Sequence, residues 1–174
     1  MIQIEKSGTL CPNNDQTLFT MQGFGDYMTG GVASALKSRD YKDATDLITA
    51  VDGLTVRRLT PLECERLQGF PDGWTDIGAW TDSKGKLHPE SVDSLRYKAL
   101  GNSIALPPWA YVLTRLSLCV GSERPTMASL FDGIGGFPLI WEWLNGKGTC
   151  LWASEIEDFP IAVTKLHFPD EVHP

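Results

Sequence analysis

"MASLFDGIGGFPLIWEWLNGKGTCLWASEIEDFPIAVTKLHF", residues 127–168, is the stretch that decides the fold. The apolar run 127–131 predicts a buried strand, the glycine-rich segment 132–136 a tight turn, and residues 137–145 a helix with one apolar face. A second strand near 150–154 and a second helix complete the stretch. This β-α-β-α order predicts two parallel strands in an α/β sheet, joined by a right-handed crossover.

A glycine-rich turn between a strand and a helix is typical of a site for a nucleotide-like cofactor. Glu155 ends the second strand, where a carboxylate can accept hydrogen bonds from ribose hydroxyls. Both a nicotinamide dinucleotide and S-adenosylmethionine fit this pattern, and a tight turn without a ligand is a further alternative. Pro138 stands where a dinucleotide fingerprint has its third glycine, and Asp132 would repel a pyrophosphate. Asp132 suits the positive groups of S-adenosylmethionine, which is therefore the favoured cofactor.

Two helices are predicted upstream of this stretch. In "RRLTPLECERLQGFPDGW", residues 57–74, Thr60 suits the N-cap, and Glu63 three residues later completes a capping box. Gly69 then ends the helix, and residues 73–90 are polar and turn-rich, which predicts a surface loop. The second helix begins near Leu106 with two prolines in its first turn, and its expected apolar face comprises Trp109, Val112, Leu113 and Leu116.

The first 56 residues are rich in small and polar residues between short apolar pieces. The segments "SGTLCPNNDQTLF" and "ASALKSRDYKDATDLI" are weakly alike, which predicts two irregular β-hairpins that form a degenerate repeat. A scaffold is the favoured interpretation of this region. The alternative is a DNA-facing role for Lys37, Arg39 and Lys42.

Length and composition narrow the class of protein. A chain of 174 residues corresponds to about one domain, without an apolar run of membrane-span length or a signal peptide. Its four cysteines form no Cys-x-x-Cys pair, so we expect no metal site and reduced thiols in the cytoplasm. The net charge of −7 argues against a non-specific nucleic-acid binder. Because the acidic excess is concentrated in residues 121–174, contacts to phosphates are expected in the first part.

Four blocks of the sequence resemble motifs of the DNA (cytosine-5) methyltransferases. "SLFDGIGGF" followed by "WASEIEDFPIAVTKLHFPD" is similar to the first two motifs, which bind S-adenosylmethionine in that family. "RRLTPLECERLQGFPD" is similar to the ninth motif, which supports the target-recognition region. "YKALGNSIALPP" is similar to the tenth, which closes the methionine end of the cofactor site. The resemblance implies a partial Rossmann-like methyltransferase fold with an irregular β-rich N-terminal segment.

The resemblance also implies roles for individual residues. Phe131 and Ile156 match apolar contacts to the adenine, although both could instead be plain core residues. Glu155 matches the ribose-binding carboxylate. The loop under the methionine and ribose is matched by Asp132, Gly133, Gly135 and Gly136. Asn102 and Ser103 match the cofactor-contacting pair of the tenth motif, with capping of the following helix as the alternative. For Arg58 and Arg66, ion pairs within the scaffold are favoured over base readout.

The order of the blocks resembles that of circularly permuted, partly phage-encoded members, because motifs nine and ten precede motif one. This order predicts four segments: an irregular β-rich edge of the target-recognition region (1–56), the ninth and tenth motifs (57–119), a linker (120–126) and the start of the cofactor domain (127–174). The linker would join ends that lie close together in the fold.

Other family motifs are missing from the sequence. It has no Pro-Cys-Gln with the nucleophilic cysteine, no Glu-Asn-Val and no Gln-Arg-x-Arg-x-Arg, and the third motif would begin just after Val172. We therefore expect no catalytic residue in this chain, structural roles for all four cysteines, and no activity without a partner. The expected partners are double-stranded DNA and a complementary methyltransferase chain or a second copy, as in a split restriction-modification enzyme. The alternative is a non-catalytic S-adenosylmethionine-binding subunit or a degenerate remnant.

Overall fold

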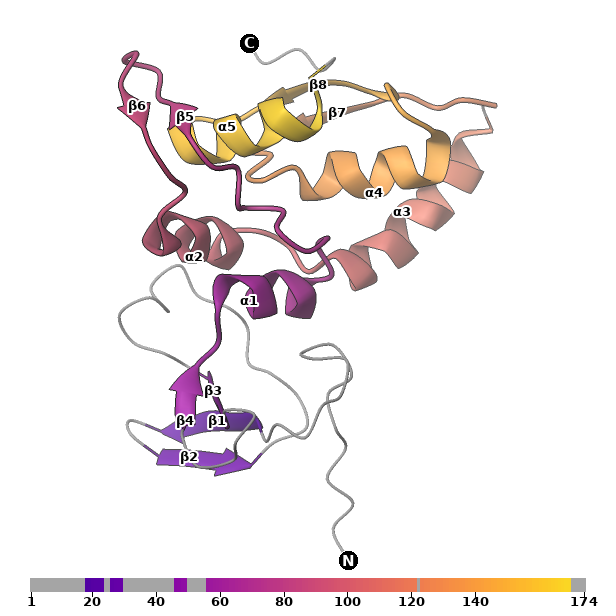
Figure 1. Cartoon of the computed structure of the whole chain (residues 1–174). Coiled ribbons are helices and arrows are strands. Elements are labelled where there is room, and N and C mark those ends of the chain that lie inside the picture. Colours follow the sequence, from indigo (N-terminus) through magenta and orange to yellow (C-terminus); the bar gives the residue numbers. More distant parts are fainter. Residues whose placement is uncertain (1–17, 24–25, 30–45, 50–55, 122, 170–174) are drawn as a thin grey trace, which may run out of the picture.

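The computed structural model describes residues 18–23, 26–29, 46–49, 56–121 and 123–169 of the chain. Three small sheets and five helices occur in these residues (Figure 1). The elements are β1 (Leu18–Gly23), β2 (Asp26–Thr29), β3 (Asp46–Thr49), β4 (Val56–Arg58), α1 (Pro61–Gln68), β5 (Trp80–Thr81), β6 (Leu87–His88), α2 (Asp93–Gly101), α3 (Leu106–Val120), β7 (Met127–Leu130), α4 (Gly136–Asn145), β8 (Cys150–Ser154) and α5 (Asp158–His167). The mixed helix and strand content confirms an α/β class with a β-rich N-terminal part.

The N-terminal sheet is antiparallel, in the order β2-β1-β3-β4. It contains two antiparallel pairs of strands that are neighbours in sequence, β1–β2 and β3–β4, but each pair begins only at the end of a segment that was expected to form a hairpin by itself. The first pair lies later in the chain than the quoted segment, most of which is outside the described residues, as are Lys37, Arg39 and Lys42. The sheet lies at one end of the molecule and leads through β4 directly into α1 (Figure 1).

The first helix, α1, begins and ends as predicted. The Thr60 hydroxyl accepts a hydrogen bond from the Glu63 backbone N–H, and the Glu63 carboxylate accepts one from the Thr60 N–H, which completes the capping box. Gly69 ends the helix in the left-handed conformation, with φ of 85°.

The surface-loop prediction for residues 73–90 is wrong in part. The segment contains the short β5–β6 hairpin, and two of its tryptophans, Trp74 and Trp80, are buried. Polarity patterns miss this arrangement because each indole enters the core from a segment whose other residues are mostly polar.

The helices α2 and α3 follow. α2 was not predicted, and neither of these two helices has a side-chain cap. α3 contains Pro107 and Pro108 in its first turn, as expected, and packs against α4. Of its predicted apolar face only Leu113 is buried; Trp109 contacts the Phe137 ring of α4 at 5.0 Å between centroids yet stays 40% exposed, and Val112 and Leu116 are about half exposed. No single described helix is long and apolar enough to cross a membrane, although α2 and α3, bent by 46°, pass such a test as a pair.

The decisive stretch forms the predicted β-α-β-α unit. β7 and β8 are parallel, with Ser129 opposite Ala153 and Leu130 opposite Ser154, and α4 and α5 lie on the same side of this pair (Figure 1). The prediction that residues 127–131 form a buried strand is wrong, because Leu130 is 62% exposed and only Ser129 is buried. The pair lacks cover on its second face within the described residues.

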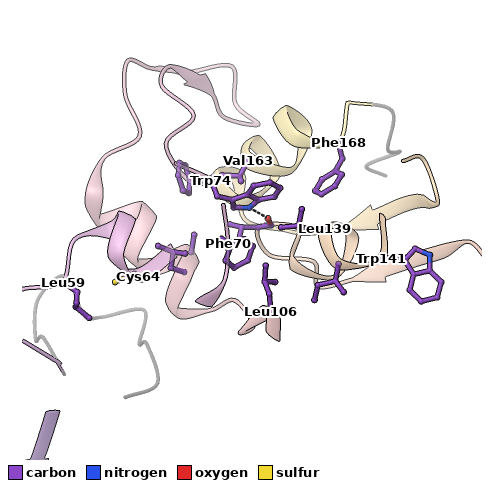
Figure 2. Close-up of a cluster of buried hydrophobic side chains, with 14 of the residues drawn as sticks. Leu59, Cys64, Phe70, Trp74, Leu106, Leu139, Trp141, Val163 and Phe168 are labelled. Atoms are coloured by element: carbon purple, nitrogen blue, oxygen red, sulfur yellow. Dashed lines mark hydrogen bonds between the residues drawn. The ribbon is translucent and has the colours of Figure 1, made fainter. Parts of the chain in front are cut away.

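The main core lies between the helices α1 to α5 rather than on the parallel strands. It is built from side chains that are distant in sequence, with Phe70 and Trp74 from the segment after α1 meeting Leu106, Leu139 and Val163 (Figure 2). This core therefore joins the motif-nine and motif-ten elements to the glycine-rich turn.

Candidate functional site

The candidate site lies where the carboxyl ends of β7 and β8 meet the start of α4. Its turn, residues 131–136, follows β7 directly and is tied to the end of β8 by the Asp132 backbone N–H, which donates to the Ser154 carbonyl (3.0 Å). Within the turn, the Gly135 N–H donates to the Asp132 carbonyl (3.2 Å). In open α/β sheets, ligands bind beyond the carboxyl ends of the strands. The predicted glycine turn therefore stands in the position that such a site requires.

Asp132 is the least satisfied group of the turn. Its side chain is buried, and its Oδ1 accepts a hydrogen bond from the Ser129 hydroxyl at 2.5 Å. Its Oδ2 is also buried and has no hydrogen-bond partner among the described residues. Burial, and secondarily the charge of Glu155, raise the pKa of Asp132 to about 6, against the lowering effect of the Ser129 hydrogen bond. A buried acceptor without a partner is costly unless a ligand supplies a donor.

The three glycines of the turn differ in what surrounds them. All but Gly136 have positive φ, and a Cβ on Gly135 would lie 2.7 Å from the Phe168 ring, while one on Gly136 would lie 2.9 Å from Ile104 Cγ1. Those two glycines are required for packing. A Cβ on Gly133 (φ +62°) would meet nothing within 4 Å. Gly133 thus faces open space, as a residue beneath a ligand does.

Phe131 and Ile156 lie at the two strand ends, and each is 90% exposed. The alternative that they are plain core residues is therefore wrong. Phe131 also has φ of 54°, the only positive value at a described residue other than glycine, a strained conformation that clusters at functional sites. Two large, exposed apolar side chains flank the turn and suit an apolar ring.

Glu155 is engaged by the backbone of its own site. Its Oε2 accepts from the Gly133 N–H at 2.7 Å, and its Oε1 accepts from Ile156 at 2.7 Å and from Glu157 at 3.0 Å. A carboxylate has about four acceptor positions, so about one is left for a ligand. The structure thus shows a function that the sequence did not suggest: Glu155 ties the end of β8 to the glycine turn.

Asn102 and Ser103 are placed beside the turn by their neighbour Ile104, which packs against Gly136. Asn102 ends α2, and the N-cap of α3 is Ala105 without a side-chain bond. The alternative that Asn102 or Ser103 caps the following helix is therefore wrong. Asn102 is exposed and Ser103 is partly exposed, and neither side chain is hydrogen-bonded within the described part of the chain.

The arginines and cysteines for which structural roles were predicted differ in their surroundings. Arg66 pairs with Asp72 through two hydrogen bonds of 2.5 and 2.7 Å, as the scaffold interpretation predicts. Arg58 is exposed, and it is its neighbour Arg57 that pairs with Glu63. Three cysteines are free thiols, two of them buried: Cys64, Cys119 and Cys150. Cys11 lies outside the described residues.

Three residues at the site were missed by sequence reasoning. The Trp74 indole N–H donates to the Ile134 carbonyl inside the turn at 2.7 Å, and the Gln68 amide donates to the Leu100 carbonyl at 2.8 Å. The Lys98 ammonium bonds both oxygens of Glu157, at 2.6 and 2.8 Å. Gln68 and Lys98 lie within the quoted motif blocks, but no local pattern indicates the partner of any of the three residues, because each bond spans a long sequence separation.

Comparison with models of known protein families identifies the family of this chain. The model of the C-5 cytosine-specific DNA methylases matches residues 13–117. This match contains α1, α2, Asn102 and Ser103, whereas the glycine turn and Glu155 lie beyond it.

The individual relatives are all named as methyltransferases, but the phage P1 relative is named for N-6-adenine and not for cytosine. The chain is 28% identical to a protein of Escherichia phage P1 named DNA N-6-adenine-methyltransferase, over 221 residues that take in 74% of this chain and 28% of the relative. It is 44% identical over 52 residues to the type II methyltransferase M.HgiCI of Herpetosiphon aurantiacus, covering 30% of this chain and 9% of the relative. It is 34% identical over 74 residues to M.SsoII of Shigella sonnei, covering 42% of this chain and 16% of the relative. The chain thus spans less than a third of each of these relatives.

Proposed function

Because the chain belongs to the family of C-5 cytosine-specific DNA methylases, we propose that it supplies the S-adenosylmethionine-binding side of an enzyme that methylates cytosine in DNA. The observation that carries this proposal is the buried Oδ2 of Asp132, which has no partner in the described residues. This oxygen lies in a turn whose flanking residues, Phe131 and Ile156, are exposed. A cationic ligand with an aromatic ring matches both features.

Each site residue then has a defined task. Asp132 would face the positive end of the cofactor, and Phe131 and Ile156 would contact its adenine. Glu155 would accept one ribose hydroxyl while holding the turn. The methionine end would contact Gly133, Gly135, Gly136, Asn102 and Ser103. When bound, S-adenosylmethionine supplies a methyl group activated by its positive sulfonium, and the residues of this chain bind and orient it.

The proposal extends to the arrangement of the whole enzyme. The family match precedes the glycine turn, which supports a circular permutation. The segment between α3 and β7 is tied to α4 by the Trp141 indole N–H, which donates to the Pro125 carbonyl at 3.1 Å. We propose double-stranded DNA and a complementary methyltransferase chain as partners, in a restriction-modification setting. Free thiols at the described cysteines suit the cytoplasm.

Calorimetric titration tests the cofactor site. S-adenosylmethionine and its demethylated product should bind the wild type weakly, and Glu155→Ala should lower the affinity by about tenfold or more, because a charge-assisted contact and the tie to Gly133 are both lost. The matched control is Glu142→Ala. Glu142 Oε1 also accepts a backbone N–H, from Gly148 at 2.7 Å, but it lies in the last turn of α4.

Equal binding by Glu155→Ala and wild type would remove Glu155 from the site. A nicotinamide dinucleotide serves as the second probe, and binding of this ligand in place of S-adenosylmethionine would contradict the proposed cofactor. Binding of S-adenosylmethionine without any DNA methylation, even with a native partner, would favour a non-catalytic subunit or a degenerate remnant.

A further inference from the structure

Trp74 connects the segment after α1 to the glycine turn. Its indole is buried and donates to the Ile134 carbonyl at 2.7 Å, between Gly133 and Gly135 in the chain (Figure 2). The His167 ring stacks on the indole at 3.6 Å between centroids, and His167 Nε2 donates to the Trp74 carbonyl at 2.9 Å. His167 therefore contacts both the ring face and the backbone carbonyl of Trp74. The indole N–H, the one polar group of the side chain, points at the glycine turn.

Glu65 of α1 fixes the backbone on both sides of Trp74. Its side chain is fully buried and accepts from the backbone N–H groups of Gly73 (2.7 Å) and Thr75 (2.8 Å), and from the Thr75 hydroxyl. The Arg96 guanidinium of α2 lies 3.3 Å from the same carboxylate. A buried charge that is bonded this fully holds a rigid loop conformation.

Gln68, in the last turn of α1, contacts the segment that leads to Asn102 and Ser103 at the end of α2. Its buried amide donates to the Leu100 carbonyl at 2.8 Å, two residues before Asn102. The same helix therefore reaches the glycine turn through Trp74 and the Asn102–Ser103 segment through Gln68.

We propose that α1 and the segment that follows it position both halves of the cofactor site, with Gln68 of α1 and Trp74 of that segment as the positioning residues. Neither residue touches the cofactor. Trp74 sets the place of the Ile134 carbonyl and with it the Asp132–Gly133 turn, while Gln68 sets the end of α2. The inference rests on the proposed cofactor function and extends it, because it couples the element beside the N-terminal sheet to cofactor binding.

A pair of matched tryptophan variants tests Trp74. Trp74→Phe keeps a ring against His167 and removes the hydrogen bond to Ile134. Trp80→Phe is the control, because Trp80 is equally buried and stacked on a histidine, His88, while its indole N–H has no partner among the described residues. We expect Trp74→Phe to lower the affinity for S-adenosylmethionine by about five- to tenfold, and Trp80→Phe to leave it within about twofold.

Amide hydrogen exchange gives a readout that does not need the cofactor. In the free protein, Trp74→Phe should speed the exchange of the Gly133 and Gly135 amides by about five- to tenfold relative to Trp80→Phe, because the turn loses an anchor. A purely structural tryptophan would lower overall stability in both variants and change these amides equally.

These two measurements distinguish failure of the positioning role of Trp74 from failure of the proposed cofactor. Equal affinities and equal exchange in the two variants would overturn the positioning role of Trp74. Selective acceleration at Gly133 and Gly135 in a protein that binds no S-adenosylmethionine would support the coupling of α1 to the turn and contradict the cofactor.

Gln68→Met tests the second branch in the same way. Methionine fills a similar volume without the donor to Leu100. We expect faster exchange at the Asn102 and Ser103 amides, which bond Lys98 and Leu100, with Gly133 unchanged. Acceleration at Gly133 alone, or no change at Asn102 and Ser103, would overturn the assignment of Gln68.

Discussion

At the scale of single residues, Asp132 is expected to affect both the stability of the fold and the proposed cofactor binding. Its folded pKa, raised to about 6 by burial and the Glu155 charge, lies above the value of about 3.9 expected in the unfolded chain. The folded state therefore binds this proton more tightly than the unfolded state. Its stabilising effect is present below the unfolded pKa and is lost as the pH rises through about 6. At neutral pH the ionised carboxylate is a local source of instability.

Asp132→Asn should consequently separate stability from binding. Between pH 5 and pH 7.5 the wild type should lose about 1–2 kcal/mol of unfolding free energy from this group, and the variant should lack that contribution. Because the charge that faces a cationic ligand is gone, the variant should bind S-adenosylmethionine at least about tenfold more weakly. Urea unfolding and calorimetry at the two pH values measure both effects. A variant with wild-type affinity would show that Asp132 does not face the ligand's charge.

Wild-type affinity should show the matching pH dependence. A cationic ligand is bound by the ionised carboxylate, so affinity should decrease as the pH falls through about 6. Affinity that stays constant from pH 7.5 to pH 5 would contradict this.

At the scale of elements, α1 is the best-specified helix. Thr60, Glu63 and Arg57 form one network, in which two hydrogen bonds from Arg57 reach the Glu63 carboxylate at 2.7 and 2.8 Å. Burial acts to raise the pKa of Glu63, but the hydrogen bonds from Arg57 and Thr60 outweigh it and hold the pKa below its usual value. The start of α1 is thus fixed by a polar network within residues 57–63.

Thr60→Ala should lower the unfolding free energy by about 1 kcal/mol, as measured by urea denaturation. Thr114→Ala is the control, because the Thr114 hydroxyl bonds the Ala110 carbonyl inside α3 at 2.7 Å and caps no helix end. That change should be neutral or slightly stabilising. If Thr60→Ala and Thr114→Ala lower the unfolding free energy equally, the capping position of Thr60 gives no stability beyond that of an ordinary helix hydroxyl.

Elements with local signals were predictable, and elements held by distant partners were not. Each predictable feature depends on residues only a few positions apart, so the sequence identifies it. These features are the capping box of α1, the prolines of α3 and the glycine turn. α2 lacks a side-chain cap and begins after Val92. The inward position of Trp74 depends on Ile134, sixty residues away. Nothing near Trp74 in sequence encodes such a partner.

At the scale of the whole molecule, the parallel pair presents an apolar face. Leu130 and Trp152 lie on the same side of β7 and β8, opposite Ser154 and Ala128 in the register, and are 62% and 37% exposed. α4 and α5 lie on the other side (Figure 1). Parallel sheets are normally covered on both faces, so the bare face fits the proposed contact with a complementary methyltransferase chain.

The last prediction concerns methyl transfer. Under the proposed function this chain supplies the cofactor side of the enzyme, and a partner chain supplies the nucleophile. Addition of a thiolate to the cytosine ring is what makes C5 nucleophilic enough to be methylated, and this sequence has no Pro-Cys-Gln. Of its cysteines, Cys64 and Cys150 are buried. The purified chain alone should therefore incorporate no labelled methyl into DNA, whereas addition of a chain with the missing motifs should restore transfer. Incorporation by the chain alone that is abolished by Cys11→Ser or Cys64→Ser would show that the nucleophile lies here after all.

In the complemented enzyme, Cys119→Ser should leave the rate unchanged, because this exposed thiol lies near the end of α3, away from the glycine turn.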